Sequence, residues 1–206
     1  KFLFPIFLAF PSMKKVFLAT LLAMVSLFAF SQTSSGLWNS STATYTNSAH
    51  KITWQLIEDL DWIGRPILSG STLLKVRNDD THILVKLGAN KEVGIKGDVW
   101  DYVSEKEPPQ LEKMHKQQAQ QNGMTYLGAK SARSQLCGNH AIKKRIDMKK
   151  DYSEHGQTVH CIEIEYLFYK GDYIYTVSVM ALSVLEEEVD LFERVATQLF
   201  NGFSIK

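Results

Sequence analysis

Two short segments of the sequence hold residue types that catalysis or metal binding would need. Cys137–His140 brings a thiol close to an imidazole, as a cysteine nucleophile requires. His155, His160, Cys161 and Glu163 offer nitrogen, sulfur and oxygen atoms that can bind zinc. Their spacing matches no zinc motif, and His160 and Cys161 would point to opposite faces of a strand. We therefore predict no catalytic residue, no metal site and no cofactor.

Aromatic side chains are the other candidates for a binding site. They could line a groove for a sugar, a peptide or an apolar ligand, although such residues more often pack in a core. We place the predicted contact surface at the loop from residue 62 to residue 66 and the aromatic side chains near it. The candidate ligand-contact residues are Trp62, Arg65, Trp100 and Tyr102.

The composition excludes several classes of protein. The chain has 206 residues, 23 basic and 22 acidic side chains, and 45% hydrophobic residues. These values exclude a disordered tail, a collagen-like fibre and a disulfide-dense miniprotein. Three lysines and no acidic residue lie before residue 32, so the remainder is slightly negative. It lacks the clustered positive charge that binding to phosphates requires, and we predict no nucleic-acid partner.

Residues 13–31 have the pattern of an export signal. Two lysines precede an apolar run, Val16–Phe30, and Ala29 and Ser31 are the small residues expected before a cleavage site at Gln32. The apolar run is shorter than the roughly 20 residues that cross a bilayer. We expect cleavage before Gln32, a periplasmic or secreted product, and no stable membrane insertion of that product.

The signal divides the chain into four predicted parts. Residues 1–12 are expected to be an upstream extension from a start site assigned too early, and 13–31 are the signal peptide. A membrane hairpin over residues 2–30 is the rival interpretation, disfavoured by its prolines and its central lysine pair. Residues 32–49, rich in Ser and Thr, are predicted to be a linker. Residues 50–206 are long enough for a single domain with one core.

The predicted compartment affects the interpretation of the two cysteines. Outside the cytoplasm, Cys137 and Cys161 can oxidise to a disulfide. A hairpin around residues 151–157 would instead place Cys161 opposite about residue 146. A disulfide and two separate thiols both stay open.

Hydrophobic periodicity predicts a mixture of strands and helices. Alternation indicates a strand over 52–56, and TLLKVR and HILVKL indicate a hairpin around 78–80. Helical composition covers 98–122, with one piece over 98–105 and a second from Pro109 to Gly123, whose inward residues would be Leu111, Met114 and Ala119. Four further strands are predicted over 124–133, 140–149, 158–169 and 173–182.

The last helix has the clearest pattern. Ser183 and Glu186 form a predicted capping box at its start, and Gly202 can end it. Phe203 and Ile205 are expected to return to the core. One apolar stripe has helical spacing and should pack on the sheet: it contains Leu185, Val189, Phe192, Ala196 and Leu199.

This order of elements resembles the Mog1/PsbP-like fold. The resemblance rests on the helix before Gly123, the hairpin LFYKGDYIYTVSV and the final LFERVATQLFNGFSI, and it covers about residues 50–205. It implies an α+β domain, an α/β/α sandwich in which an antiparallel β-sheet is flanked by helices. Members include accessory proteins of photosynthetic complexes, a partner of a small GTPase and exported bacterial proteins, so the resemblance transfers no single function.

The combined prediction is an exported, non-catalytic binding or accessory domain of the bacterial cell envelope. Its partner would be an unidentified protein or small ligand. One alternative is a hydrolase or metal-dependent enzyme whose site residues are dispersed in the sequence. The other is a membrane-attached protein that keeps its N-terminal segment.

Overall fold

The computed structural model describes residues 36–66, 71–92, 97–103, 109–152 and 157–206. Within these ranges the strands form two antiparallel sheets. The small sheet has the order β1 (Leu37–Asn39), β2 (Thr44–Asn47), β3 (Ile52–Gln55) and β11 (Phe203–Ile205). The large sheet has the order β4 (Ile63–Pro66), β5 (Thr72–Asn78), β6 (Ile83–Lys91), β10 (Tyr173–Leu185), β9 (Gln157–Lys170), β8 (Asn139–Tyr152) and β7 (Thr125–Leu136).

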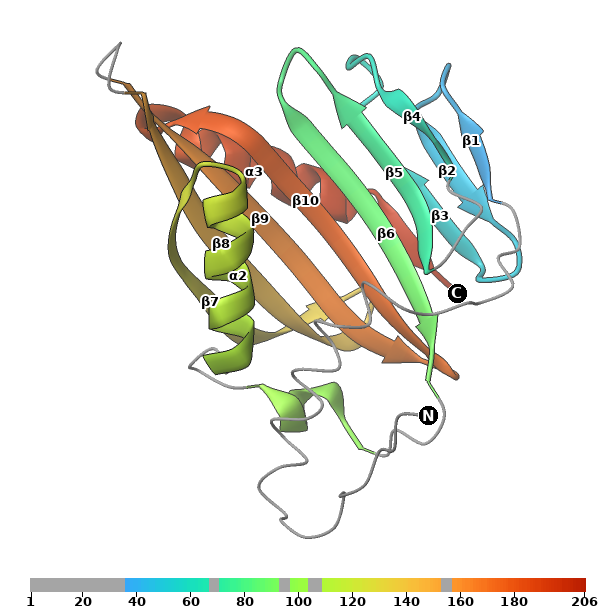
Figure 1. Cartoon of the computed structure of the whole chain (residues 1–206). Helices are drawn as coiled ribbons and strands as arrows, with labels where there is room; N and C mark the ends of the chain where they lie inside the picture. The colour runs from blue at the N-terminus through green and yellow to red at the C-terminus, as the bar shows by residue number, and fades with distance from the viewer. Residues whose placement is uncertain (1–35, 67–70, 93–96, 104–108, 153–156) are drawn as a thin grey trace, which may run out of the picture.

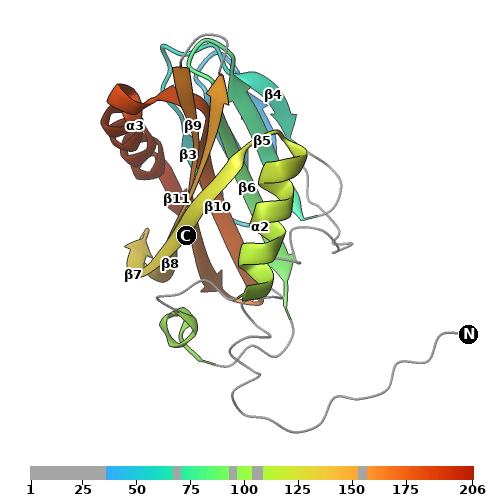
Figure 2. The same ribbon diagram turned by 60° about the vertical axis from the view of Figure 1, so that its left-hand side comes forward.

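The large sheet is covered on both faces (Figure 1). The small sheet and the C-terminal helix α3 (Val189–Asn201) share one hydrophobic core with its first face. The helix α2 (Pro109–Gln121) and the short 3₁₀ helix η1 (Val99–Tyr102) lie against the second face, and Figure 2 shows α2 and α3 on opposite sides of the sheet. The predicted arrangement of an antiparallel sheet between helices is confirmed.

The main core lies between the large sheet, the small sheet and α3. Trp54, Tyr45 and Phe168 are its largest fully buried side chains. The Trp54 Nε1–H donates a hydrogen bond of 2.8 Å to the carbonyl of Leu199, which joins β3 to α3. Burial of the aromatic area supplies the driving force, and this bond satisfies the one polar atom of the indole.

The C-terminal helix forms as its apolar stripe predicts, but it begins later than expected. Strand β10 continues to Leu185 and is followed by the 3₁₀ turn η2 (Glu186–Glu188). The Leu185 backbone N–H donates to the Glu188 carboxylate at 3.2 Å, so this bond at the start of η2 takes the place of the predicted Ser183–Glu186 capping box. Gly202 ends α3, and Phe203 and Ile205 return to the core as β11.

Helix α2 begins at Pro109, as predicted, because proline loses no hydrogen bond in the first turn. Leu111 and Ala119 are buried as expected, whereas Met114 is only partly buried. His115 lies midway between them at i, i+4 spacing and is buried as well. The inward face of α2 is therefore more polar than the sequence predicted. Of the other predicted helical piece, residues 99–102 form η1 and residues 104–105 lie outside the described part.

The predicted linker over residues 32–49 is wrong for residues 37–47. They form β1, a turn and β2, and Tyr45 is fully buried opposite Trp54 of β3. Thr44 and Thr46 of β2 point to the outer face of the small sheet, whereas the polar Asn47 is buried on the inner face and its amide donates to the Tyr45 hydroxyl at 3.0 Å. That composition is typical of a linker and equally of a strand with a single buried face.

The predicted hairpins are confirmed, with strands longer than the patterns indicated. β5 and β6 pair across the turn after Asn78, and β9 and β10 pair across Gly171, where φ is positive. Among the described residues, no helix combines the length and apolarity needed to span a bilayer.

Candidate functional site

A row of polar side chains crosses four strands of the large sheet. Lys86 of β6 pairs with Ser178 of β10, Ser178 pairs with Glu165 of β9, and Glu165 pairs with Lys144 of β8. Register partners point to the same face of a sheet, so these four residues form one line, which we call the polar row. It lies on the face that α2 covers.

A cavity of about 220 Å³ lies between α2 and the polar row. All four residues of the row line this cavity, which we call the α2 cavity, and so do Asn90 of β6, Thr176 of β10 and Glu163 of β9. Helix α2 contributes Met114, His115 and Gln118. At about 30 Å³ per water molecule, the volume equals roughly seven waters.

The same face is apolar on either side of the polar row. At one end Leu84, Met180 and Ile146 form a cluster with Ala119 of α2. At the other end Val99 of η1 packs with two side chains of the hairpin, Leu167 and Ile174. The polar row thus lies between two hydrophobic clusters on the same face of the large sheet.

The charged side chains of the α2 cavity lie close together. The Lys86 Nζ lies 3.7 Å from a carboxylate oxygen of Glu163. Burial raises the pKa of Glu165 to about 7, the Glu163 carboxylate adds to the rise, and Lys144 and Lys86 only partly oppose it. Glu165 therefore changes charge near neutral pH.

Asn90 is a buried amide with an unsatisfied oxygen. Its side chain is only 5% exposed, and its Oδ1 accepts no hydrogen bond from any part of the chain that the structure describes. A buried polar atom without a partner costs about 1–3 kcal/mol, and such atoms are rare in native proteins. Asn90 is also one of the residues that line the α2 cavity.

The predicted aromatic contact surface is not assembled as one site. Trp62 is buried in the core between the two sheets, where its Nε1–H donates to the Ile57 carbonyl at 2.8 Å. Trp100 lies in η1, on the other face of the large sheet. Arg65 belongs to β4 and Tyr102 to η1, but their side chains lie outside the described part of the chain.

Trp100 has a structural role that its partners explain. Its indole stacks on the His140 ring with centroids 3.6 Å apart, and its Nε1–H donates to the carbonyls of Ser134 and Ala141 at 3.0 Å each. The His140 Nδ1 in turn bonds to the Asp98 carboxylate. These contacts fasten η1 to β7 and β8.

The two cysteines are free thiols in the structure. Cys137 lies in the turn between β7 and β8, and its Sγ–H donates to the Phe203 carbonyl at 2.9 Å. Cys161 lies on β9 opposite Met148 of β8, nine residues from the start of β8 at Asn139. At about 3.3 Å per residue the two positions are about 30 Å apart along the sheet, too far for the disulfide that the sequence left open.

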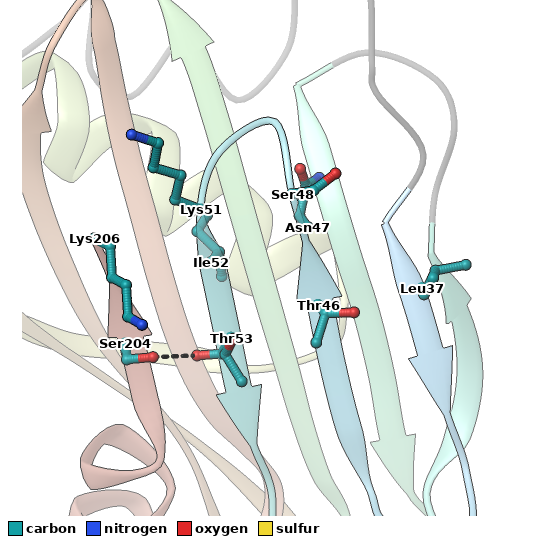
Figure 3. A pocket seen from close by; sticks show the side chains of 9 residues that line it. All are labelled: Leu37, Thr46, Asn47, Ser48, Lys51, Ile52, Thr53, Ser204 and Lys206. Atoms are coloured by element: carbon teal, nitrogen blue, oxygen red, sulfur yellow. Dashed lines mark hydrogen bonds between the residues drawn. The ribbon is translucent and has the colours of Figure 1, made fainter.

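A second hollow lies on the outer face of the small sheet. This pocket has about 310 Å³ and is lined by a cross-strand row of Leu37, Thr46, Thr53 and Ser204 together with Lys51 and Lys206 (Figure 3). These six residues are exposed, and the Ser204 hydroxyl donates to the Thr53 carbonyl at 3.2 Å. None of the buried, unpartnered atoms found in the described chain belongs to it, so the α2 cavity is the stronger candidate.

Metal ligands do not gather in either place. Within the described ranges, no three His, Cys, Asp or Glu side chains come close enough to hold an ion. His155, one of the four residues whose atoms could bind zinc, lies outside those ranges. His160 lies 2.5 Å from the Glu186 carboxylate.

Comparison with known proteins shows the fold and leaves the activity open. No protein-family model matches the chain. No curated protein matches it in sequence. The solved structure of cyanobacterial PsbP from Synechocystis sp. PCC 6803 is similar, with a TM-score of 0.50 and 11% identity over 88% of this chain and 99% of that one.

Two other solved structures are more distant. LpqN of Mycobacterium tuberculosis, described as involved in cell envelope biogenesis, has a TM-score of 0.42 and 12% identity over 75% of this chain and 83% of its own. The Ran-binding protein Mog1p of Saccharomyces cerevisiae has a TM-score of 0.39 and 12% identity over 77% and 92%. The likeness to cyanobacterial PsbP shows the predicted Mog1/PsbP-like α+β fold, with its C-terminal helix packed on the sheet.

Proposed function

We propose that this protein is an exported, non-catalytic binding domain of the bacterial cell envelope, and that it holds a small ligand in the α2 cavity. The observation that carries the proposal is the α2 cavity itself, which is lined by two lysines, two glutamates and the Asn90 amide, whose oxygen accepts no hydrogen bond within the described residues. The export signal pattern of residues 13–31 supports the location. The likeness to cyanobacterial PsbP concerns the fold and adds no ligand.

Stability alone gives no reason for the residues of the polar row. Replacing buried ionic groups by apolar side chains of similar volume is often neutral or stabilising. Here Lys86, Glu165 and Lys144 lie between two apolar clusters that show how this face could have been packed. Groups that cost stability without improving packing are typical of functional sites.

The chemistry around the cavity favours binding over thiol catalysis. Burial raises the pKa of Cys161 to about 11, and the nearby Glu163 carboxylate adds to the rise. A thiol with such a pKa is almost fully protonated at neutral pH and is a weak nucleophile. The polar row therefore offers charged and hydrogen-bonding groups to a ligand, without an activated thiol beside them.

Native mass spectrometry of the protein purified from cells tests the proposal. We expect a small molecule to remain bound under native conditions and to be released on denaturation. Asn90→Leu, which fills the polar position with an apolar side chain of similar size, should lose it. Thr46→Val in the small-sheet pocket is the matched control and should retain it. A ligand that survives Asn90→Leu and is lost with Thr46→Val would contradict the assignment.

Sequencing the N-terminus of the same material tests the location. The proposal expects Gln32 as the first residue in a periplasmic or extracellular fraction. A cytoplasmic protein that keeps residues 13–31 would overturn the exported part of the proposal.

A further inference from the structure

We propose that the α2 cavity binds a small zwitterion, a molecule that carries both an ammonium and a carboxylate group, such as a free amino acid. This inference rests on the proposed function and specifies the chemistry of its ligand. It follows from the signs and spacing of the charges, from the neutral polar groups between them and from the volume of the cavity.

The cavity presents both signs of charge at short range. Glu165 and Lys144 are direct register partners on neighbouring strands, about 5 Å apart between backbones. Lys86 and Glu163 form the second pair, with 3.7 Å between charged atoms. A ligand with a single charge would gain one opposite charge and meet a like charge beside it, which disfavours it. A ligand with both charges finds a partner for each.

Neutral groups of the cavity can serve both ends of such a ligand. The Asn90 amide offers an acceptor and two donors, and its oxygen has no partner within the described residues. The hydroxyls of Ser178 and Thr176 lie on β10, between the charged residues of β6 and those of β9. An ammonium requires acceptors and a carboxylate requires donors, and this set supplies both without changing the charge balance.

The volume limits the size of the ligand. A cavity of about 220 Å³ is smaller than the roughly 300–1,000 Å³ of pockets that hold drug-sized molecules. It has room for a free amino acid, whereas a nucleotide or an oligosaccharide would have to extend beyond it. Helix α2 forms one wall through Met114, His115 and Gln118, so the ligand would be covered on that side.

Titration calorimetry with matched probes tests the inference. The probes are γ-aminobutyrate and the free α-amino acids, with butylamine and butyrate as singly charged compounds of similar size. We expect at least one zwitterion to bind about tenfold or more tightly than either singly charged compound, because loss of a charged hydrogen-bond partner in a buried site costs at least that factor.

Variants then assign the binding to the polar row. Glu165→Gln and Lys144→Met should each weaken binding of the zwitterion by about tenfold or more. The matched control is Lys143→Met, one residue away on β8, whose ammonium lies 5.9 Å from the centre of the Tyr166 ring on the opposite face. That variant should bind as the unmodified protein does. Circular dichroism and thermal unfolding verify that each variant is folded.

The outcomes separate this inference from the proposed function. If butylamine or butyrate binds in the α2 cavity more tightly than every zwitterion, the inference of a zwitterionic ligand is wrong, but the proposed function as a binding domain stands. Absence of binding by every probe would also overturn it, and native mass spectrometry then decides the proposed function separately. Equal loss of binding in Lys143→Met and Lys144→Met would contradict the role of the polar row.

Discussion

Replacing Glu165 by glutamine should stabilise the protein at alkaline pH and change its stability little in acid. Glu165 faces Lys86, Lys144 and Glu163 from the sheet and His115 from α2. Burial and the Glu163 carboxylate raise its pKa to about 7 from an ordinary value of 4.5. The folded state therefore binds the proton more tightly than the unfolded state does, and ionisation of Glu165 opposes folding.

The size of the effect follows from that difference in pKa. A rise from 4.5 to about 7 corresponds to about 3 kcal/mol of unfolding free energy, present below pH 4.5 and lost as the pH rises to 7. Glutamine keeps the shape and removes the ionisation. Because it also removes a partner of Lys144, we expect a net gain of about 1–3 kcal/mol at pH 8 relative to pH 4.

Urea unfolding of both proteins between pH 4 and pH 8 measures this gain. Glu187→Gln, at an exposed carboxylate of η2, is the control and should show no such pH-dependent difference. A stability difference between the Glu165 variant and the parent that stays constant over the whole range would refute the reasoning, and so would a loss that grows toward pH 8.

Three further predictions concern the core and the cysteines. Leu199→Ala removes a fully buried side chain of α3 and should lower the unfolding free energy by about 2–5 kcal/mol in chemical denaturation; a loss below 1 kcal/mol would contradict the packing of α3 on the sheet. Trp54→Phe loses the bond to the Leu199 carbonyl and leaves a void, and a drop of about 2–4 kcal/mol should appear as a lower melting temperature. Iodoacetamide should label Cys137 in the folded protein and Cys161 only after unfolding, and mass spectrometry that finds a Cys137–Cys161 disulfide instead would contradict the separation of the two thiols.

Local sequence patterns predicted those helices and hairpins whose boundaries are marked by residues within the element itself. The apolar stripe around Phe192 and Ala196 is continuous over the whole of α3, and Gly202 marks its end. Proline at position 109 fixes the start of α2 in the same way. The hairpin at Gly171 has a turn residue flanked by two alternating runs. Each of these signals spans no more than about fifteen residues, so a single sequence is enough to predict the element.

The start of α3 was misplaced because two local signals compete. Ser183 and Glu186 have the spacing of a capping box, yet β10 continues through Ser183 after a register shift beyond Ala181. Pairing of Val184 with His160 of β9 extends the strand and moves the start of α3 to Val189. Pairing with a strand more than twenty residues away decided this boundary.

The candidate site could not be predicted because it depends on the order of strands in the sheet. Glu163 and Glu165 alternate with isoleucines, the usual pattern of a strand with one solvent-exposed face. The structure instead covers that face with α2 and places β9 between β8 and β10. The pairing of β10 with β6 brings Lys86 into line with Ser178 and Glu165, whereas the register of Glu165 with Lys144 belongs to the hairpin of β8 and β9. The one available signal was His115, which lies at i, i+4 spacing between the inward residues Leu111 and Ala119 of α2.

The most direct test of the account is to locate the bound probe by NMR. Titration of the ¹⁵N-labelled protein with γ-aminobutyrate should shift the backbone amide signals of Asn90, Lys144, Glu165 and Ser178, and these shifts should saturate together. Shifts confined to Thr46, Lys51 and Thr53 on the small sheet, or no saturable shift near α2, would contradict the claim that the α2 cavity is the ligand site.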